Sequence, residues 1–173
     1  IDGKGELALN ETADVSKIRQ NNRRVEIVVT ASSSTTKIEK PTAQKILKGK
    51  LKIGDKIRLK NIYFKSSYST IIPSSIPTLK EIAAILVKRK NIYFTIQGHV
   101  CCTHDIYDAI DRKTSQRNLS YSRAKFIYTY LLQQGVEKHR MKFIGLKRKF
   151  PLGGDPKLDR RVEILITHIG KEI

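Results

Sequence analysis

The stretch NIYFTIQGHVCCTHD, residues 91–105, joins a strand pattern to a polar segment with two adjacent cysteines. Apolar and polar side chains alternate over residues 92–97, which is the pattern of a β-strand with one buried face. Gly98 and His99 end the alternation, and the cysteine pair follows at once. We expect a central strand that ends here and leads into a recognition loop.

Helical and strand patterns alternate on either side of this strand. A β-rich run precedes it at residues 57–65, and a helix is expected from Ser75 to the basic segment KRK. Residues 120–134 form a second helical pattern, with Ser120 as a plausible N-cap and Gly135 as a stop.

Two further strands are predicted over residues 141–146 and 160–167. The order β-α-β-α-β with a further β indicates an α+β fold. We expect a two-layer βαβαβ(β) sandwich in which the helices pack on one face of a mixed sheet.

Residues 31–56 differ in composition from the rest, being rich in Ser, Thr and Lys. Such a segment is typical of a linker. At most a short helical turn is expected within it, around residues 43–47.

One strand motif occurs twice: NRRVEIVVT at residues 22–30 and DRRVEILIT at residues 159–167 agree at six of nine positions. We interpret them as corresponding strands of two related units, of which only the tail of the first is present. The expected organisation is the tail of a preceding unit (1–30), a linker (31–56), one domain (57–168) and a C-terminal tail (169–173).

The 173 residues include 34 Lys and Arg against 16 Asp and Glu, which gives a formal net charge of +18. This excess predicts attraction to a polyanion, such as nucleic acid, acidic lipid head groups or an anionic cell wall, without choosing among them. No apolar run approaches the roughly 18 residues that a membrane-spanning helix needs. Because Cys101 and Cys102 are the only cysteines and neighbours rarely bridge, we expect two free thiols.

A zinc site is an alternative interpretation of His99, Cys101, Cys102 and His104, which place four donors within six residues. Adjacent cysteines on a strand point to opposite faces, so at most three of these donors could converge. A catalytic cysteine would need an orienting partner and a lowered thiol pKa, and the sequence supplies neither. We therefore expect no metal, no cofactor and no enzymatic activity.

Five motifs in order carry a resemblance to a known family: NIYF, QGHVC, QRNLSYSRA, GVEKHRMKFIG and DRRVEI. Together they resemble the peptidoglycan-binding domain of the OmpA C-terminal family, which is also found in Pal-type lipoproteins and flagellar stator proteins. The resemblance covers about residues 57–167. It implies the same two-layer fold, and the repeated strand motif then implies a protein with two such domains in tandem.

In that family the domain binds the diaminopimelate of a peptidoglycan stem peptide. Such recognition needs a carboxylate for the ligand's ammonium and a guanidinium for its carboxylate. The resemblance places the guanidinium at Arg123, near the positive end of the second helix, and Arg160 beside the same pocket. Lys65 and Ser66 fall where the family's ligand-side loop lies. Outside this motif, Arg123 would be interpreted as a solvated helix residue.

The family's carboxylate is missing from its expected position. The acid aligns with Cys101, the residue before it with Val100, and an asparagine at the helix start with Gln116. The loop before the helix is longer than is common in the family, and one of its acids is expected to replace the lost one. These acids are Asp105, Asp108 and Asp111. Without a replacement, affinity should fall by about one to two powers of ten.

The leading hypothesis is a non-catalytic periplasmic domain, associated with the outer membrane of a Gram-negative bacterium. It would tether a protein to the cell wall by binding the stem peptide. An alternative is that the fold has lost this ligand and serves contacts with partner proteins of the cell envelope, or architecture alone. Nucleic-acid binding would rest on charge alone, because no base-reading motif is present, and it is not expected.

Overall fold

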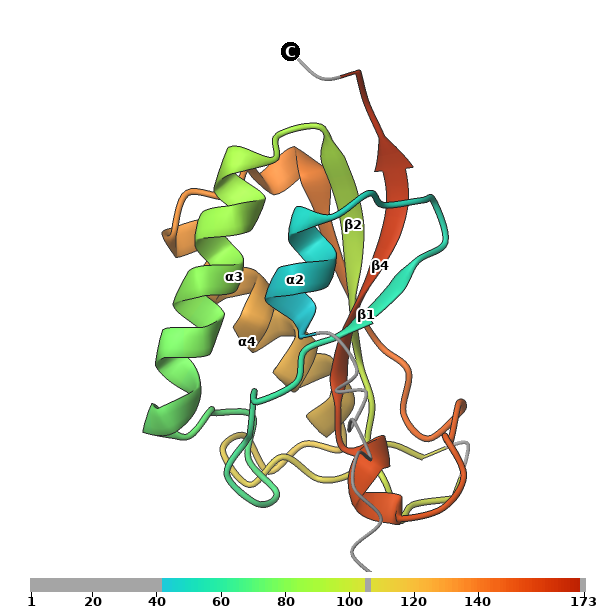
Figure 1. Cartoon of the computed structure of the whole chain (residues 1–173). Coiled ribbons are helices and arrows are strands. Elements are labelled where there is room, and N and C mark those ends of the chain that lie inside the picture. Colours follow the sequence, from blue (N-terminus) through green and yellow to red (C-terminus); the bar gives the residue numbers. More distant parts are fainter. Residues whose placement is uncertain (1–41, 105–106, 172–173) are drawn as a thin grey trace, which may run out of the picture. The chain divides into compact units, whose positions relative to one another are not determined.

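One mixed sheet organises the computed structural model, which describes residues 42–104 and 107–171 (Figure 1). Strands β2 and β3 are parallel, whereas β4 runs antiparallel to both β1 and β2. The order across the sheet is β1-β4-β2-β3. The strands are β1 (Lys56–Arg58), β2 (Ile92–Gly98), β3 (Met141–Gly145) and β4 (Val162–Ile169).

The α-helices lie together on one face of this sheet (Figure 1). They are α2 (Ala43–Lys48), α3 (Ile76–Lys88) and α4 (Leu119–Gln133). Short 3-10 turns complete the connections: η1 (Pro73–Ser75), η2 (Lys138–Arg140) and η3 (Pro156–Asp159). The predicted α+β sandwich with a mixed sheet is confirmed. None of the helices in the described ranges has the length and apolarity that crossing a bilayer requires.

The core fills the space between the helices and the sheet. The side chains that β2 buries are the ones that the alternation predicted, Ile92, Phe94 and Ile96. They meet residues at helical spacing on the inner faces of α3 and α4. These are Leu79, Ile82 and Leu86 on α3, and Ala124, Ile127 and Leu131 on α4. Each buried Leu or Ile among them contributes about 1.5–3 kcal/mol.

The predicted strand over residues 57–65 is wrong beyond Arg58. There the chain turns: Lys60 donates its N–H to the Arg58 carbonyl at 2.9 Å, and Asn61 adopts a left-handed φ of 63°. Asn is one of the few residues that tolerate this conformation. Phe64 then pairs with Ile71 through a single bridge, so NIYF is a loop segment rather than the end of a strand.

Residues 42–56, which fall in the segment predicted as a linker, contain α2 where a short helical turn was expected around residues 43–47. Ala43 and Leu47 of α2 are fully buried in the common core. Arg89, just after α3, donates to the carbonyls of Leu47 at 2.6 Å and Gly49 at 2.7 Å, which satisfies the end of α2. The predictions for residues 1–30 and for the start of the linker lie outside the described residues.

Arg140 connects the end of α3 to the start of β2. It is 2% exposed, and its guanidinium donates to the carbonyls of Leu86, Arg89 and Ile92 at 3.1, 2.9 and 3.2 Å. Glu137 accepts from its Nε at 2.9 Å. The arginine of the GVEKHRMKFIG motif therefore has a structural role.

The start of α4 rests directly on the ends of β2 and β3. A Cβ atom on Gly98 would collide with the Ser120 carbonyl, and one on Gly145 would lie 2.5 Å from the Tyr121 nitrogen. Only glycine allows the backbones to approach so closely. This contact fixes Arg123, in the next turn of α4, relative to the end of the central strand.

Candidate functional site

Arg123 is a buried arginine rather than a solvated helix residue, since only 4% of its surface is exposed. Its Nε donates to the Tyr68 carbonyl at 3.2 Å, and its Cζ lies 5.0 Å from the centre of the Phe64 ring. Both contacts come from the segment that follows β1. The NIYF motif therefore contributes to holding the guanidinium in place.

The charge of Arg123 is only partly compensated. Burial, followed by the nearby positive charge of Arg160, lowers its pKa to about 10, while Asp111, Cys101 and Asp108 act in the opposite direction. The guanidinium is therefore still protonated at neutral pH. Within the described residues, no carboxylate forms an ion pair with it. A buried cation without a fixed counter-ion favours the binding of an anion.

A cavity of about 590 Å³ lies beside this arginine. Its walls come from three places in the sequence: the end of β1 with the segment after it, the turn η3 with the residues that follow it, and α4. The described residues that line it include no acid, and the volume is in the range of ligand pockets, about 300–1,000 Å³. The lining consists of Arg58, Leu59, Lys60, Asn61, Ile62, Tyr63, Phe64, Arg123, Lys157, Leu158, Arg160 and Arg161.

Three of the predicted site residues come together here. Arg123 and Arg160 line the same cavity, and Cys101 is close enough to interact electrostatically with both. Val100 is 2% exposed, and its N–H donates to the Lys147 carbonyl at 3.1 Å. The Val100 side chain is therefore part of the interior rather than of a ligand surface.

The other predicted residues do not line the cavity. Lys65 places its Nζ over a neighbouring tyrosine ring, 4.8 Å from the centre, and Ser66 is exposed. Gln116 is exposed and accepts a hydrogen bond from an asparagine side chain at 2.9 Å. Asp105 lies outside the described residues.

Asp108 caps α4 from the preceding loop. Asn118, the residue directly before the helix, makes no capping bond with its side chain. Instead, the Asp108 carboxylate accepts from the Ser120 N–H at 3.0 Å and from the Ser120 hydroxyl at 2.6 Å. This acid is committed to the fold, because a helix start needs acceptors for its first N–H groups.

Asp111 has one uncommitted carboxylate oxygen. Its Oδ1 accepts from the Lys113 N–H at 3.0 Å, whereas its buried Oδ2 has no hydrogen-bond partner. The residue is fully buried, and its negative charge acts on Arg123. Both loop acids that the structure describes act electrostatically on Arg123, but Asp111 is the one whose carboxylate keeps an oxygen without a hydrogen-bond partner.

The histidine of QGHVC serves a buried charge cluster next to the cavity. His99 Nε2 lies 3.4 Å from Glu163 Oε2, and Arg161 Nε donates to Glu163 Oε1 at 2.7 Å. Burial by itself raises the pKa of Glu163, but the contacts with His99 and Arg161 outweigh it and lower the pKa to about 2. Arg161 is thus neutralised by a fixed acid, unlike Arg123.

Cys101 and Cys102 are free thiols whose sulfur atoms are in contact. Burial and the neighbouring Cys102 raise the pKa of the Cys101 thiol, which is the opposite of what a nucleophilic cysteine needs. Across residues 42–104 and 107–171, no group of three or more His, Cys, Asp or Glu side chains is placed to hold a metal ion.

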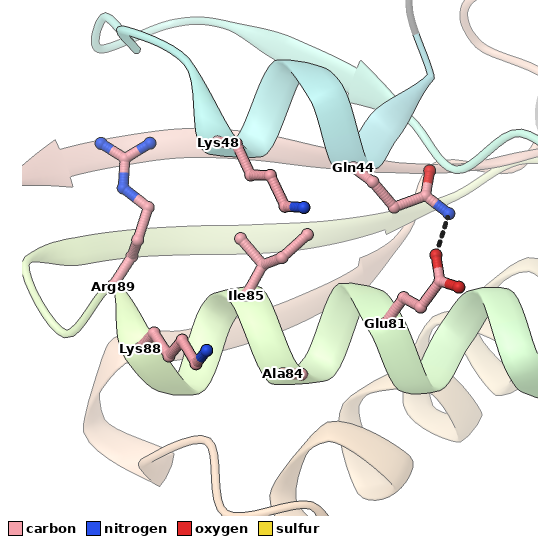
Figure 2. Close-up of a pocket in the computed structure, with 7 residues that line it drawn as sticks. All are labelled: Gln44, Lys48, Glu81, Ala84, Ile85, Lys88 and Arg89. Carbon is pink, nitrogen blue, oxygen red and sulfur yellow. Dashed lines mark hydrogen bonds between the residues drawn. The ribbon is translucent and has the colours of Figure 1, made fainter.

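A second hollow, of about 440 Å³, lies between α2 and α3 and shares no residue with the first (Figure 2). Gln44 donates to Glu81 across it at 3.3 Å, and Ala84 and Ile85 supply apolar surface. Arg89 at one end is bonded to the last carbonyls of α2. Because these polar groups already bind each other or end the helix, we assign the hollow no ligand.

Arg58 and Lys157 line the cavity without belonging to any sequence motif. They are far apart in the chain, in β1 and η3, and only the fold brings them together. The one local signal is the pair Asp155–Pro156, an N-cap followed by proline, which marks the start of η3.

The comparisons with known proteins agree with this architecture. The chain belongs to the OmpA family, whose profile matches residues 63–163. The resemblance that the motifs suggested is therefore confirmed. No protein of curated function matches the sequence significantly.

Solved structures share the fold at low sequence identity. The periplasmic domain of Helicobacter pylori MotB is 19% identical with a TM-score of 0.56, over 69% of this chain and 79% of that one. A putative MotB-like protein from Desulfovibrio vulgaris is 20% identical with a TM-score of 0.54, over 68% and 75%. The cell wall anchor of the T6SS from Pseudomonas aeruginosa is 23% identical with a TM-score of 0.53, over 65% and 79%.

Proposed function

We propose that this chain is a non-catalytic periplasmic domain that binds peptidoglycan and tethers an outer-membrane-associated protein to the cell wall. Membership of the OmpA family supports this proposal, as does the fold shared with a periplasmic MotB domain and with a T6SS cell wall anchor. The observation that carries it is Arg123, a buried cation in a cavity without a fixed counter-ion.

In this proposal the guanidinium of Arg123 binds a carboxylate of the stem peptide. Its Nε is committed to the Tyr68 carbonyl, but its two terminal nitrogens make no hydrogen bond with the described residues. These nitrogens can bind both oxygens of a carboxylate, and each charge-assisted bond contributes about 1.5–3 kcal/mol. Arg160, exposed at the same cavity, supports the binding by adding positive potential.

The ligand's ammonium would be stabilised by Asp111. Because Asp111 is buried, it acts through its negative potential next to Arg123 rather than by direct contact. It thereby takes the part of the acid that Cys101 replaces. Asp108 is unsuited to this role, since it caps α4.

The test is retention on purified peptidoglycan together with the dissociation constant for a soluble diaminopimelate-containing stem peptide. Arg123→Lys keeps the charge but loses the two-pronged geometry, so the dissociation constant should rise about tenfold or more. Lys125→Ala, an exposed neighbour on the same helix, is the matched control and should bind like the native protein. If Arg123→Lys folds normally and binds as tightly as the native chain, the proposal is wrong.

The alternative, a domain kept for protein contacts or architecture, is favoured by one observation: among the described residues, no acid lines the cavity to receive an ammonium. Titration with diaminopimelate, followed by backbone chemical shifts, separates the two functions. Shifts around Arg123 support peptidoglycan binding. Unchanged spectra at millimolar ligand support the alternative.

A further inference from the structure

The cavity beside Arg123 holds more positive charge than one carboxylate would neutralise. Arg161 is already paired with Glu163 at 2.7 Å and with Asp159 at 3.6 Å. Arg58, Arg123, Lys157 and Arg160 also line the cavity, and none of these four forms an ion pair with the described residues. The surplus is therefore in the walls of the cavity and not only in the overall charge of the chain.

Three of these cations lie on walls other than α4: Arg58, Lys157 and Arg160. Arg58 is in β1, opposite Glu163 in the register with β4, but Glu163 is committed to Arg161 and His99. Lys157 is an exposed residue of η3, whose backbone is fixed by the cap from Asp155. A cation on each of these walls can reach a ligand group that Arg123 does not bind.

Mutual repulsion among these cations favours a ligand with several negative groups. The effect is visible in Arg123, whose charge Arg160 already disfavours. A zwitterion with one carboxylate and one ammonium adds no net negative charge to the cavity, whereas a second carboxylate does. The cavity, about 590 Å³, has room for more than a single amino acid.

We propose that Arg58 and Lys157 form a second anion subsite, so that the cavity selects a peptide with at least two free carboxylates. Arg123 and Arg160 bind one carboxylate, and Arg58 and Lys157 bind the other. The inference rests on the proposed function for the choice of cavity. It adds the ligand class that this chain prefers, namely stem peptides whose glutamate carboxylate is free over those in which it is amidated.

The test compares two stem tripeptides that contain diaminopimelate with its main-chain carboxylate amidated in both. They differ only in the glutamate α-carboxylate, which is free in one, giving two free carboxylates, and amidated in the other, leaving one. The native chain should bind the free form about tenfold more tightly, the effect of one charge-assisted interaction. In Arg58→Gln/Lys157→Gln this preference should fall to about twofold or less, with the amidated peptide bound nearly as in the native chain. Lys125→Gln should keep the full preference.

Each outcome separates the two proposals. Equal affinity of the native chain for both peptides, or a preference that survives in the double variant, overturns the second subsite and leaves the proposed function standing. Failure to bind either peptide overturns both. Arg58 belongs to the short strand β1, so its substitution can disturb the fold; Lys157→Gln alone therefore serves as a second variant. It should lower the preference for the free peptide without changing the temperature midpoint of unfolding.

Discussion

Two buried arginines in this domain have different partners, and their partners indicate different roles. Arg140 donates to three carbonyls and to Glu137, so its guanidinium is fully committed. Arg123 has one carbonyl and one aromatic ring, and its terminal nitrogens are uncommitted. A buried, under-bonded cation is costly for stability, which is typical of a site that is completed by a ligand.

At the same scale, Asp111→Asn should weaken binding of a stem peptide with a free ammonium by about three- to tenfold. Asparagine keeps the oxygen that accepts from the Lys113 N–H, so the loop should persist while the negative potential beside Arg123 is lost. Isothermal titration checks this. A peptide with an acetylated amine should not be weakened, and equal losses for both peptides would show that Asp111 acts only on the fold.

The lowered pKa of Glu163 predicts that the domain loses stability in acid. This pKa is about 2 in the folded chain, against an ordinary value of 4.5. Stabilisation from this lowered pKa is fully present above about pH 4.5 and is lost as the pH falls towards about 2. Urea denaturation at pH 6 and pH 3 should show it, and Glu163→Gln should remove about 1–3 kcal/mol of the difference. An unchanged pH dependence in that variant would contradict this assignment.

At the scale of elements, α4 is the helix on which the site depends. Its first turn contacts the ends of two strands through Gly98 and Gly145, and Asp108 in the preceding loop accepts from the Ser120 N–H. The loop before α4 therefore contributes to the fold. It is connected to the segment after β1 by the Arg112 N–H, which donates to the Ser67 carbonyl at 2.9 Å.

Asp108→Ala should destabilise the domain by about 1–2 kcal/mol, the usual cost of losing a helix cap. The Ser120 N–H and hydroxyl would lose their acceptor in a buried position. Chemical denaturation measures the loss, with Lys113→Ala, an exposed residue of the same loop, as the control. A free energy of unfolding equal to that of the native chain would mean that Asn118 or water replaces the cap.

The elements with strong periodicity could be predicted from the sequence, and those set by tertiary contacts could not. The alternation over residues 92–97 and the helical spacing in α3 and α4 correspond to the observed core. The first strand was predicted to continue to residue 65, because the apolar residues on both sides of Asn61 conceal the turn there. Likewise, the sequence predicted a helical turn around residues 43–47 but not its burial, because the short, lysine-rich α2 is stabilised by packing in the core and by Arg89.

The site shows the same division. Arg123 and Arg160 could be predicted because they belong to motifs, and both line the cavity. Arg58 and Lys157 could not be predicted as site residues, because neither lies in a sequence motif and only the fold brings them to the cavity. The commitment of Asp108 to the helix start was equally hidden, because it depends on how the loop returns to α4.

At the scale of the whole molecule, a net charge of +18 predicts attraction to any polyanion, while the cavity predicts recognition of a particular one. The two effects are separable because they respond differently to salt. Exposed charges are screened, whereas a carboxylate bound to a buried guanidinium is protected from solvent ions.

Retention on peptidoglycan should therefore survive high salt in part. At about 1 M NaCl, where the Debye length is about 3 Å, surface attraction is largely removed. An excess of soluble stem peptide should then release the protein that remains bound. Co-sedimentation measures both effects. Complete release by salt, with no release by the peptide, would assign the retention to surface charge.

The direct contact between α4 and the strand ends has a consequence for how this recognition surface can change over time. Because Gly98 and Gly145 lie against the first turn of α4, this contact sets the position of the Arg123 backbone. Tyr68 and Phe64 hold its guanidinium. Apart from the cap Asp108, the stretch between Cys101 and the helix can then change in length and composition while the guanidinium stays in the same place. Ligand preference can thus diverge among relatives by remodelling one loop around a fixed cationic anchor.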